Sequence, residues 1–225
     1  WCRVPSNFRS EGDLDAFLKE NGIPGLYGID TRALTRTLRD HGTMNALLTE
    51  EAPPYGEELL ERLRGFRQEP SVPLVTRQKA EAYGGSGPHV VLWDFGAKQN
   101  LIRELTKRGC RVTAVPSFTT AEELLALRPD GVLLSNGPGD PADNMDIVRE
   151  AEKLFAAKIP MMGVCLGHQL MALANGAVTE KLPFGHRGAN QPVKDLRTGR
   201  VAVTSQNHGY TVRPGSLPET PSLRF

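Results

Sequence analysis

Short apolar segments alternate with amphipathic segments between residues 89 and 176, and this alternation restricts the fold more than any other feature. The apolar segments predict four strands, at residues 89–94, 111–115, 131–134 and 161–164. Apolar residues at helical spacing follow each of these segments. Parallel strands need such crossover helices, because the chain must return to the same end of the sheet before the next strand begins. The pattern therefore predicts an α/β fold with a doubly wound, mostly parallel sheet, which binds ligands at the carboxyl ends of its strands.

The N-terminal region follows a different pattern. We expect three helices there, the first capped by Asp13 and the second by Asp30 or Thr31. Leucines at helical spacing around residue 60 mark the third helix. Residues 44–49 predict a short strand.

Two further stretches flank the alternating segment. Proline, glycine, serine and charged residues dominate residues 69–88, a composition typical of a linker. Beyond Gly176 we expect three short antiparallel strands, at residues 191–194, 201–205 and 210–212.

Charge and cysteine content exclude several classes of protein. The chain has 27 Lys and Arg residues against 26 Asp and Glu residues, so no basic surface for nucleic acid is expected. No apolar run approaches the roughly 20 residues that a membrane helix needs. The three cysteines (Cys2, Cys110 and Cys165) form no CxxC pair and no Cys/His cluster, so we expect neither a disulfide framework nor a metal site. A reducing compartment, the cytoplasm, fits this use of cysteine.

The most informative motif lies between a predicted strand and a predicted helix and reads GVCLG, residues 163–167. It has the form of the nucleophile elbow G-x-S-x-G, with Cys165 in place of serine. The glycines permit a tight turn, the helix N-terminus favours the thiolate, and the N–H of Leu166 is placed to bind an oxyanion. The alternative is a buried structural cysteine, which we expect for Cys110. At Cys165 the strand-turn-helix setting favours a nucleophile.

A second motif follows the predicted strand before the elbow and reads SNGPGDP, residues 135–141. Taken alone, it is a turn with a helix cap at Asp140. Alternatively, Gly137 and Gly139 let the backbone approach a ligand, and an N–H there completes an oxyanion hole with Leu166. No GxxxxGK[ST] sequence is present, which excludes a P-loop phosphate site.

Together, GVCLGHQL and SNGPGDP resemble the class I glutamine amidotransferase family, which has a flavodoxin-like α/β fold. The segments GIDTRALTR, VVLWDFGAKQNLIREL and SQNHGYTV are similar to the small, glutamine-hydrolysing subunit of carbamoyl-phosphate synthases. The resemblance implies that residues 1–68 are the end of a smaller N-terminal domain. Residues 69–88 then form the linker, and residues 89–225 form a glutaminase domain that is incomplete at its C-terminus.

The resemblance also implies a role for individual residues, with Cys165 as the nucleophile. Positions that match oxyanion or glutamine contacts are Gly137, Gly139, Leu166, Gln169, Asn207, Gly209 and Tyr210, where the family often has Phe for Tyr210. The family's catalytic His and Glu lie in an HPE motif downstream of the NHG segment, and this motif is absent from the sequence. The family also has a serine contact to glutamine that would precede Trp1. We therefore expect a chain that is truncated at both ends and inactive alone.

The activity that the resemblance implies is hydrolysis of L-glutamine to glutamate and ammonia through a cysteine thioester. The ammonia passes to a large synthetase subunit, separate or fused, which uses ATP, Mg and bicarbonate to make carbamoyl phosphate for pyrimidine and arginine synthesis. No cofactor or metal is implied for this chain. Two alternatives stay open: the glutaminase part of another amidotransferase, such as those making GMP, CTP or anthranilate, and a non-catalytic regulatory module.

A cysteine nucleophile needs a base, and the chain has five histidines. His168 lies on the same predicted helix as the nucleophile and points along it, and His208 lies in the segment that the family uses for substrate. His41 and His89 are expected at a helix end and a strand start, and the role of His186 stays open. We predict that none of the five is the base.

Overall fold

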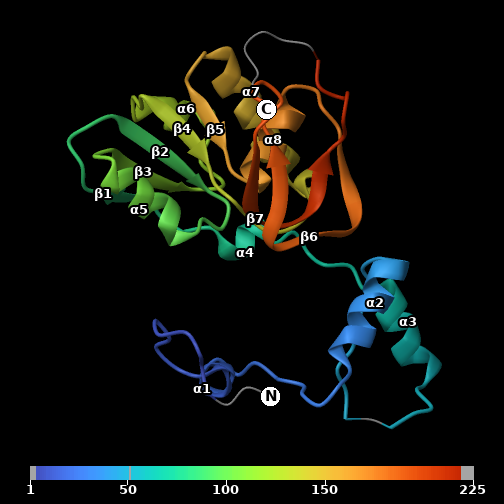
Figure 1. Cartoon of the computed structure of the whole chain (residues 1–225). Coiled ribbons are helices and arrows are strands. Elements are labelled where there is room, and N and C mark those ends of the chain that lie inside the picture. The colour runs from blue at the N-terminus through green and yellow to red at the C-terminus, as the bar shows by residue number, and fades with distance from the viewer. Residues whose placement is uncertain (1–3, 51, 219–225) are drawn as a thin grey trace. The chain divides into compact units, whose positions relative to one another are not determined.

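Five strands form one mostly parallel sheet in the computed structural model of the chain, which describes residues 4–50 and 52–218 (Figure 1). The strands are β1 (Glu81–Tyr83), β2 (His89–Asp94), β3 (Arg111–Pro116), β4 (Gly131–Leu134) and β5 (Met161–Gly163). Their order across the sheet is β1-β3-β2-β4-β5. Strands β2 to β5 are parallel, and β1 pairs with β3 in the antiparallel direction. The predicted doubly wound, mostly parallel sheet is confirmed.

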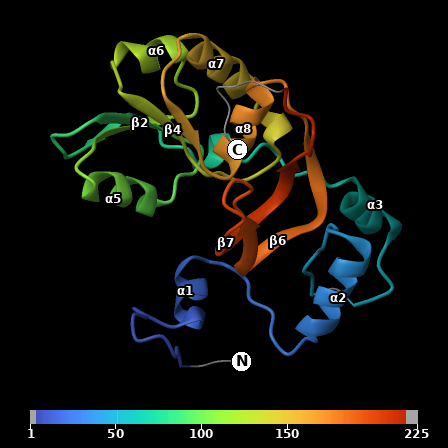
Figure 2. The ribbon, with the colours of Figure 1, turned by 45° about the horizontal axis from the view of Figure 1, so that its top comes forward.

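Helices cover both faces of this sheet, as Figure 2 shows. They are α5 (Gln99–Lys107), α6 (Ala121–Ala126), the 3-10 helix η1 (Pro141–Asn144), α7 (Met145–Ala156) and α8 (Leu166–Ala174). Side chains alternate between the faces along β2, so Trp93 packs with α6, α7 and α8, whereas Leu92 packs with Ile102 of α5. Helix α6 begins with a capping box, in which Thr120 and Glu123 each bond the other's backbone N–H.

The strand order fixes where a ligand can bind. The chain passes from β2 to β3 on one side and then returns to β4 on the other side of β2. The loops that follow β2 and β4 therefore leave the sheet in opposite directions, and ligands of such sheets bind between these loops at the carboxyl ends of the strands. The segment SNGPGDP follows β4 directly, and the elbow follows β5, the next strand.

Residues 69–88 differ from the predicted linker. They contain the one-turn helix α4 (Val72–Val75) and the edge strand β1. Val72 is buried in the core, and the side chain of Arg77 donates to the buried carboxylate of Asp94 at 2.9 Å. The composition of residues 69–88 is typical of a linker and does not reveal β1, because this strand forms only by pairing with β3.

The described residues up to Met44 form a separate compact unit. It contains α1 (Leu14–Glu20), capped by Asp13, and α2 (Thr31–His41), capped by Asp30, so both predicted caps are confirmed. The third predicted helix is α3 (Glu57–Gly65). The predicted strand at 44–49 is wrong: this segment is irregular, and no described residue pairs with it as a strand. An isolated strand is not stable, because its backbone groups need a partner strand.

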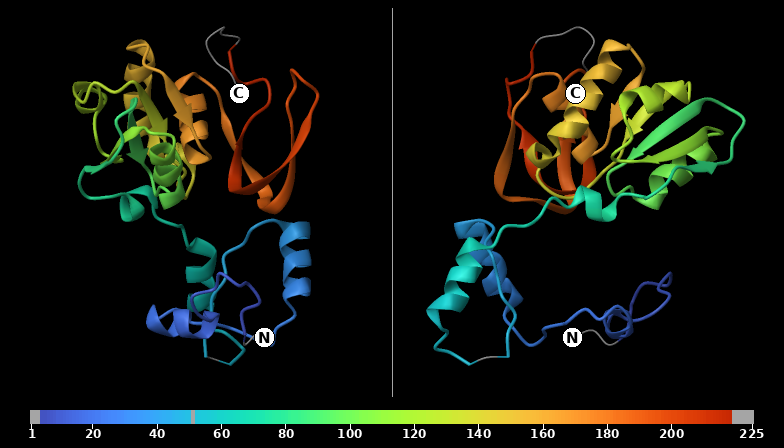
Figure 3. Two further views of the ribbon diagram at one scale, coloured as in Figure 1. Left: turned by 60° about the vertical axis from the view of Figure 1, so that its left-hand side comes forward. Right: turned by 180° about the vertical axis from the view of Figure 1, so that it is seen from behind.

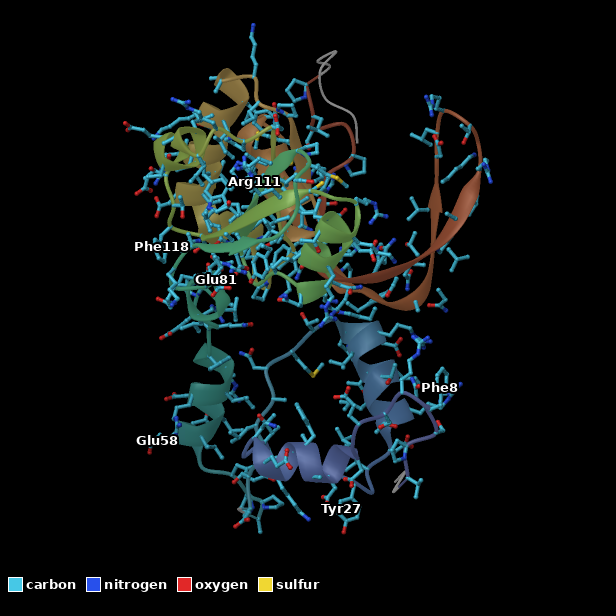
Figure 4. All side chains as sticks on the ribbon, turned by 90° about the vertical axis from the view of Figure 1, so that its left-hand side faces the viewer. Phe8, Tyr27, Glu58, Glu81, Arg111 and Phe118 are labelled. Carbon is cyan, nitrogen blue, oxygen red and sulfur yellow. The ribbon has the colours of Figure 1, made fainter. Side chains whose placement is uncertain are left out.

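The last two strands are β6 (Thr179–Lys194) and β7 (Val201–Val212), which form a long antiparallel hairpin. The three short strands that the sequence predicts lie within this hairpin, one in β6 and two in β7. Figure 3 shows the hairpin beside α8, and Figure 4 shows side chains crowded around the sheet but sparse along the outer hairpin. In the described part of the chain, no helix is long and apolar enough to cross a membrane. Cys2 lies outside the described residues.

Candidate active site

Cys165 occupies a strained turn between β5 and α8. Its backbone has φ +53° and ψ −110°, a left-handed conformation that residues with a side chain rarely adopt. It is the N-cap residue of α8, so its sulfur lies at the positive end of that helix. The strain is what a nucleophile elbow requires, because it turns the side chain out of the strand-to-helix path.

The two glycines of the elbow are required by close backbone contacts. A Cβ at Gly163 would lie 2.5 Å from the backbone nitrogen of His168, and one at Gly167 would lie 2.3 Å from the carbonyl oxygen of Leu134. The N–H of Gly167 donates to the Ser135 carbonyl at 3.0 Å, which fixes the elbow against the end of β4. The sequence pattern predicted glycines for a tight turn, and the structure adds that no side chain fits at either position.

The loop after β4 lies beside the loop after β2, at the carboxyl ends of the two strands. Ser135 is fully buried, and its hydroxyl accepts the N–H of Phe95 at 2.8 Å. The Asn136 amide donates to the Gly96 carbonyl at 2.9 Å and accepts the N–H of Lys98 at 3.0 Å. These bonds tie the loop after β4 to the loop after β2. Sequence reasoning did not assign this role to Ser135 and Asn136, although both stand beside the glycines it selected.

Gly137 and Leu166 are brought together. A Cβ at Gly137 would lie 2.5 Å from the Phe95 carbonyl oxygen and 2.7 Å from Cδ2 of Leu166. Gly139 has φ +92°, a conformation that favours glycine. Leu166 is the first residue of α8, where backbone N–H groups have no acceptor within the helix. The backbone around Gly137 therefore lies next to the helix N-terminus that follows the sulfur, as an oxyanion hole needs.

Gln169 and Tyr210 connect α8 to β7. The Gln169 side chain is buried, and its Nε2 donates to the Tyr210 carbonyl at 2.7 Å. Burial, with Asp140 beside it, raises the pKa of Tyr210 to about 12. The approach of Gly137 to Leu166 and the bond from Gln169 to Tyr210 therefore bring together three predicted segments of the site, at 137–139, 165–169 and 210.

Asn207 and Gly209 are held mainly by the hairpin itself. The Asn207 amide oxygen accepts a bond from Arg187 of β6, the residue opposite it in the register. A Cβ at Gly209 would lie 3.3 Å from Nη2 of the same Arg187. No sequence motif predicts a role for Arg187, whose only sequence signal is its place beside His186 in the glycine-rich segment 185–188.

Three histidines lie on α8 and the hairpin, and His41 and His89 lie elsewhere. His186 and His208 face each other across the hairpin, with Nδ1 of His186 and Nε2 of His208 3.2 Å apart. Burial, and after it the charge of His208, lowers the pKa of His168. His89 begins β2, at the end of the strand away from the elbow, as predicted. His41 ends α2 in the separate N-terminal unit, also as predicted.

This arrangement defines a class of protein. The family model described as glutamine amidotransferase class-I matches residues 91–223, so the chain belongs to that family. A second model, the CPSase domain of the carbamoyl-phosphate synthase small chain, matches residues 1–48.

Two relatives that cover most of the chain share the name carbamoyl phosphate synthase small chain. The chain is 56% identical over 217 residues to a carbamoyl phosphate synthase small chain of Listeria monocytogenes serotype 4b, covering 96% of this chain and 59% of the relative. It is 51% identical over 224 residues to the small chain of Symbiobacterium thermophilum, covering 96% and 62%. The chain thus spans about three-fifths of the length of these relatives.

Among solved structures, a glutamine amidotransferase from Thermotoga maritima is similar at a TM-score of 0.41 and 17% identity, covering 56% of this chain and 62% of that one. The predicted resemblance to class I glutamine amidotransferases and to small chains of carbamoyl-phosphate synthase is confirmed.

Proposed function

We propose that the protein hydrolyses glutamine to glutamate and ammonia, with Cys165 as the nucleophile. The observation that carries this proposal is the left-handed backbone of Cys165 at the N-terminus of α8, flanked by glycines that no larger residue could replace. Such a geometry turns the sulfur out of the sheet and places it next to backbone N–H groups, which is the arrangement that acyl transfer uses.

The chemistry proceeds in two halves. The Cys165 thiolate attacks the side-chain amide carbon of glutamine, and the resulting oxyanion is stabilised by the N–H of Leu166 and the backbone around Gly137 and Gly139. The C–N bond breaks and protonated nitrogen leaves as ammonia. Water then attacks the thioester through a second oxyanion. Glutamate leaves, and the Cys165 thiol is regenerated.

The remaining residues bind the substrate in this proposal. Gln169 lies beside the nucleophile and fixes the Tyr210 backbone. Asn207, Gly209 and Tyr210 hold the amino-acid end of glutamine, as the family resemblance implies. The general acid and base are assigned by the same resemblance to an HPE motif that this sequence does not contain, and none of the five histidines takes that role.

We further propose that the ammonia passes to a large synthetase subunit, separate or fused, that uses ATP and Mg to form carbamoyl phosphate. The match of residues 1–48 to the small-chain domain model supports this assignment over a glutaminase that serves GMP, CTP or anthranilate synthesis. In this proposal the protein is cytoplasmic, residues 1–68 belong to the small-chain N-terminal domain, and residues 89–225 belong to the glutaminase domain.

A labelling experiment tests the proposed nucleophile and also rejects a non-catalytic module. A diazoketone analogue of glutamine forms a carbon–sulfur bond with an activated thiolate and loses N2. In the full-length protein we expect one label on the peptide containing Cys165, and we expect glutamine to protect against it. The matched control is Cys110→Ala, which should be labelled as the wild type is. Labelling that glutamine does not slow, or that falls on Cys110, would contradict the proposal.

A further inference from the structure

Asn136 is the residue directly before Gly137, and its side chain bonds the neighbouring loop twice. Nδ2 of Asn136 donates to the Gly96 carbonyl at 2.9 Å, and Oδ1 accepts the N–H of Lys98 at 3.0 Å. Both partners belong to the loop after β2, whereas Asn136 belongs to the loop after β4. An amide has one donor end and one acceptor end, so it satisfies a carbonyl and an N–H at once. The side chain therefore fixes the start of the loop after β4 at two points.

The loop after β2 is itself held by Asp94, the last residue of that strand. The Asp94 side chain is buried, and its Oδ1 accepts the N–H groups of Gly96 at 2.8 Å and of Ala97 at 2.6 Å. Its other oxygen, Oδ2, accepts Nε of Arg77 at 2.9 Å. Hydrogen bonds to a carboxylate are charge-assisted and are stronger than bonds between neutral groups. Asn136 thus bonds a turn that the sheet already fixes through a buried carboxylate.

The backbone between Asn136 and the next anchored side chain is less firmly held. That next anchor is Asp140, which caps η1. Between the two, the N–H groups of Gly137 and Gly139 make no hydrogen bond to any of the described residues. Gly139 is also loosely packed, since the nearest atoms to a Cβ there are those of Ser71, at 4.0 Å. The backbone at 137–139 is therefore fixed by the anchors at its two ends, and its N–H groups are available to a ligand.

We propose that Asn136 is a positioning residue, whose amide bridges two backbone groups of the loop after β2 and thereby holds the backbone at 137–139 in place to stabilise the oxyanion. The inference rests on the proposed glutaminase function and adds to it a side chain that the protein engages at both ends. Oxyanion donors are effective when they are fixed before the charge develops, because no reorganisation is then needed during the reaction. A looser loop should therefore slow the chemical step and leave the binding of glutamine nearly unchanged.

The test compares two asparagines that each donate to a backbone carbonyl. Asn136→Ala removes both bonds to the loop after β2. Asn175→Ala, the matched control, removes a 2.8 Å bond from Nδ2 to the Met171 carbonyl, at the end of α8 away from the elbow. In the full-length protein we expect Asn136→Ala to lower kcat for glutamine hydrolysis about tenfold with KM changed less than about twofold. We expect Asn175→Ala to leave both constants within about twofold of the wild type. Thermal unfolding of each variant checks that the fold is kept.

A second readout isolates the oxyanion. The Cys165 thiol adds across the C=O bond of an aldehyde analogue of glutamine, and the oxygen of this tetrahedral adduct lies where the oxyanion forms. Such an adduct resembles the transition state, so its affinity should fall together with kcat. The inhibition constant of the aldehyde should rise about tenfold in Asn136→Ala and stay unchanged in Asn175→Ala. A role in stability alone would lower the melting temperature without changing this constant.

A second variant, Asn136→Asp, keeps the test decisive if the alanine protein folds poorly. Aspartate still accepts the Lys98 N–H but turns an oxygen toward the Gly96 carbonyl in place of a donor. We expect kcat to fall about tenfold here as well, with KM nearly unchanged. A wild-type kcat in these variants, or a loss confined to KM with an unchanged aldehyde constant, would overturn the positioning role while leaving the glutaminase intact. A wild-type protein that releases no glutamate would overturn both the proposed function and this role.

Discussion

The segment around Cys165 and the segment around Tyr210 both contribute to the candidate site, but they are held in different ways. Backbone contacts fix the elbow: Gly163 and Gly167 leave no room for a Cβ, and the Gly167 N–H bonds the end of β4. Side chains hold residues 207–210, through bonds from Arg187 to Asn207 and from Gln169 to the Tyr210 carbonyl.

The difference separates two requirements of catalysis. Attack on an amide needs the sulfur at a fixed place relative to N–H donors, and only a packed main chain supplies that precision. The substrate end requires recognition, which exchangeable side-chain bonds can provide. Changes in the elbow should therefore damage folding or chemistry, whereas changes in residues 207–210 should mainly alter affinity.

The largest effect is expected for Cys165→Ser. In the full-length protein with its synthetase partner, synthesis from glutamine should fall about a thousandfold or more, because the thioester cannot form. Synthesis from added ammonia should change less than about twofold, since ammonia bypasses the thiolate. Both nitrogen sources are assayed on one preparation, with Cys110→Ala as the control. Glutamine-dependent synthesis that survives in Cys165→Ser would remove this residue from the mechanism.

The next effect contrasts a glycine from each segment. Gly167→Ala should lower the free energy of unfolding by about 1 to 3 kcal/mol, because its Cβ meets the Leu134 carbonyl oxygen at 2.3 Å and the main chain must shift. Gly209→Ala should change it by less than about 0.5 kcal/mol, because its Cβ meets only the flexible end of Arg187. Urea unfolding of both variants checks this, and equal losses would mean that the two segments are held alike.

A smaller effect is expected for Asn207→Ala. We predict that KM for glutamine rises about 5- to 20-fold while kcat changes less than about threefold, because contacts to the amino-acid end are equal in the ground and transition states. Arg187→Ala, which removes the partner of the Asn207 amide, should act in the same direction but more weakly. Steady-state kinetics over a wide range of glutamine concentrations test this prediction. A loss confined to kcat would instead assign residues 207–210 to the chemical step.

The smallest effect concerns pH. Burial, and after it the charge of His208, lowers the pKa of His168 below its ordinary 6.5 in the folded chain. The unfolded chain then binds a proton near pH 6.5 that the folded chain binds only at lower pH. The contribution of His168 to the free energy of unfolding is complete above about pH 6.5 and is lost as the pH falls. Urea midpoints should drop less for His168→Gln than for the wild type between about pH 7.5 and 5.5, and equal slopes would contradict this.

Local sequence patterns predicted much of the sheet. Residues 89–94 and 131–134 form strands with the predicted ends, because a buried parallel strand is a continuous apolar run between turn residues. The elbow was predicted for a similar reason, since its glycines, nucleophile and helix are consecutive in sequence.

Contacts between distant segments were the part that sequence could not supply. Strand β1 depends on pairing with β3, and residues 44–49 have no such partner among the described residues. The Gln169–Tyr210 and Arg187–Asn207 bonds each join residues whose proximity is set by tertiary packing or by the hairpin register. A sequence motif can identify such residues, but it does not show which other residues they bond.

The central claim is that glutamine is hydrolysed through a thioester on Cys165, and acid quenching during turnover tests it most directly. Full-length protein is mixed with glutamine, stopped in acid while glutamate is still accumulating, digested and examined by mass spectrometry. The account predicts that the peptide containing Cys165 gains the mass of a glutamyl group, that hydroxylamine removes it, and that Cys165→Ser never shows it. Release of ammonia with no glutamyl group on that peptide, in a preparation that quenches the reaction completely, would contradict the account.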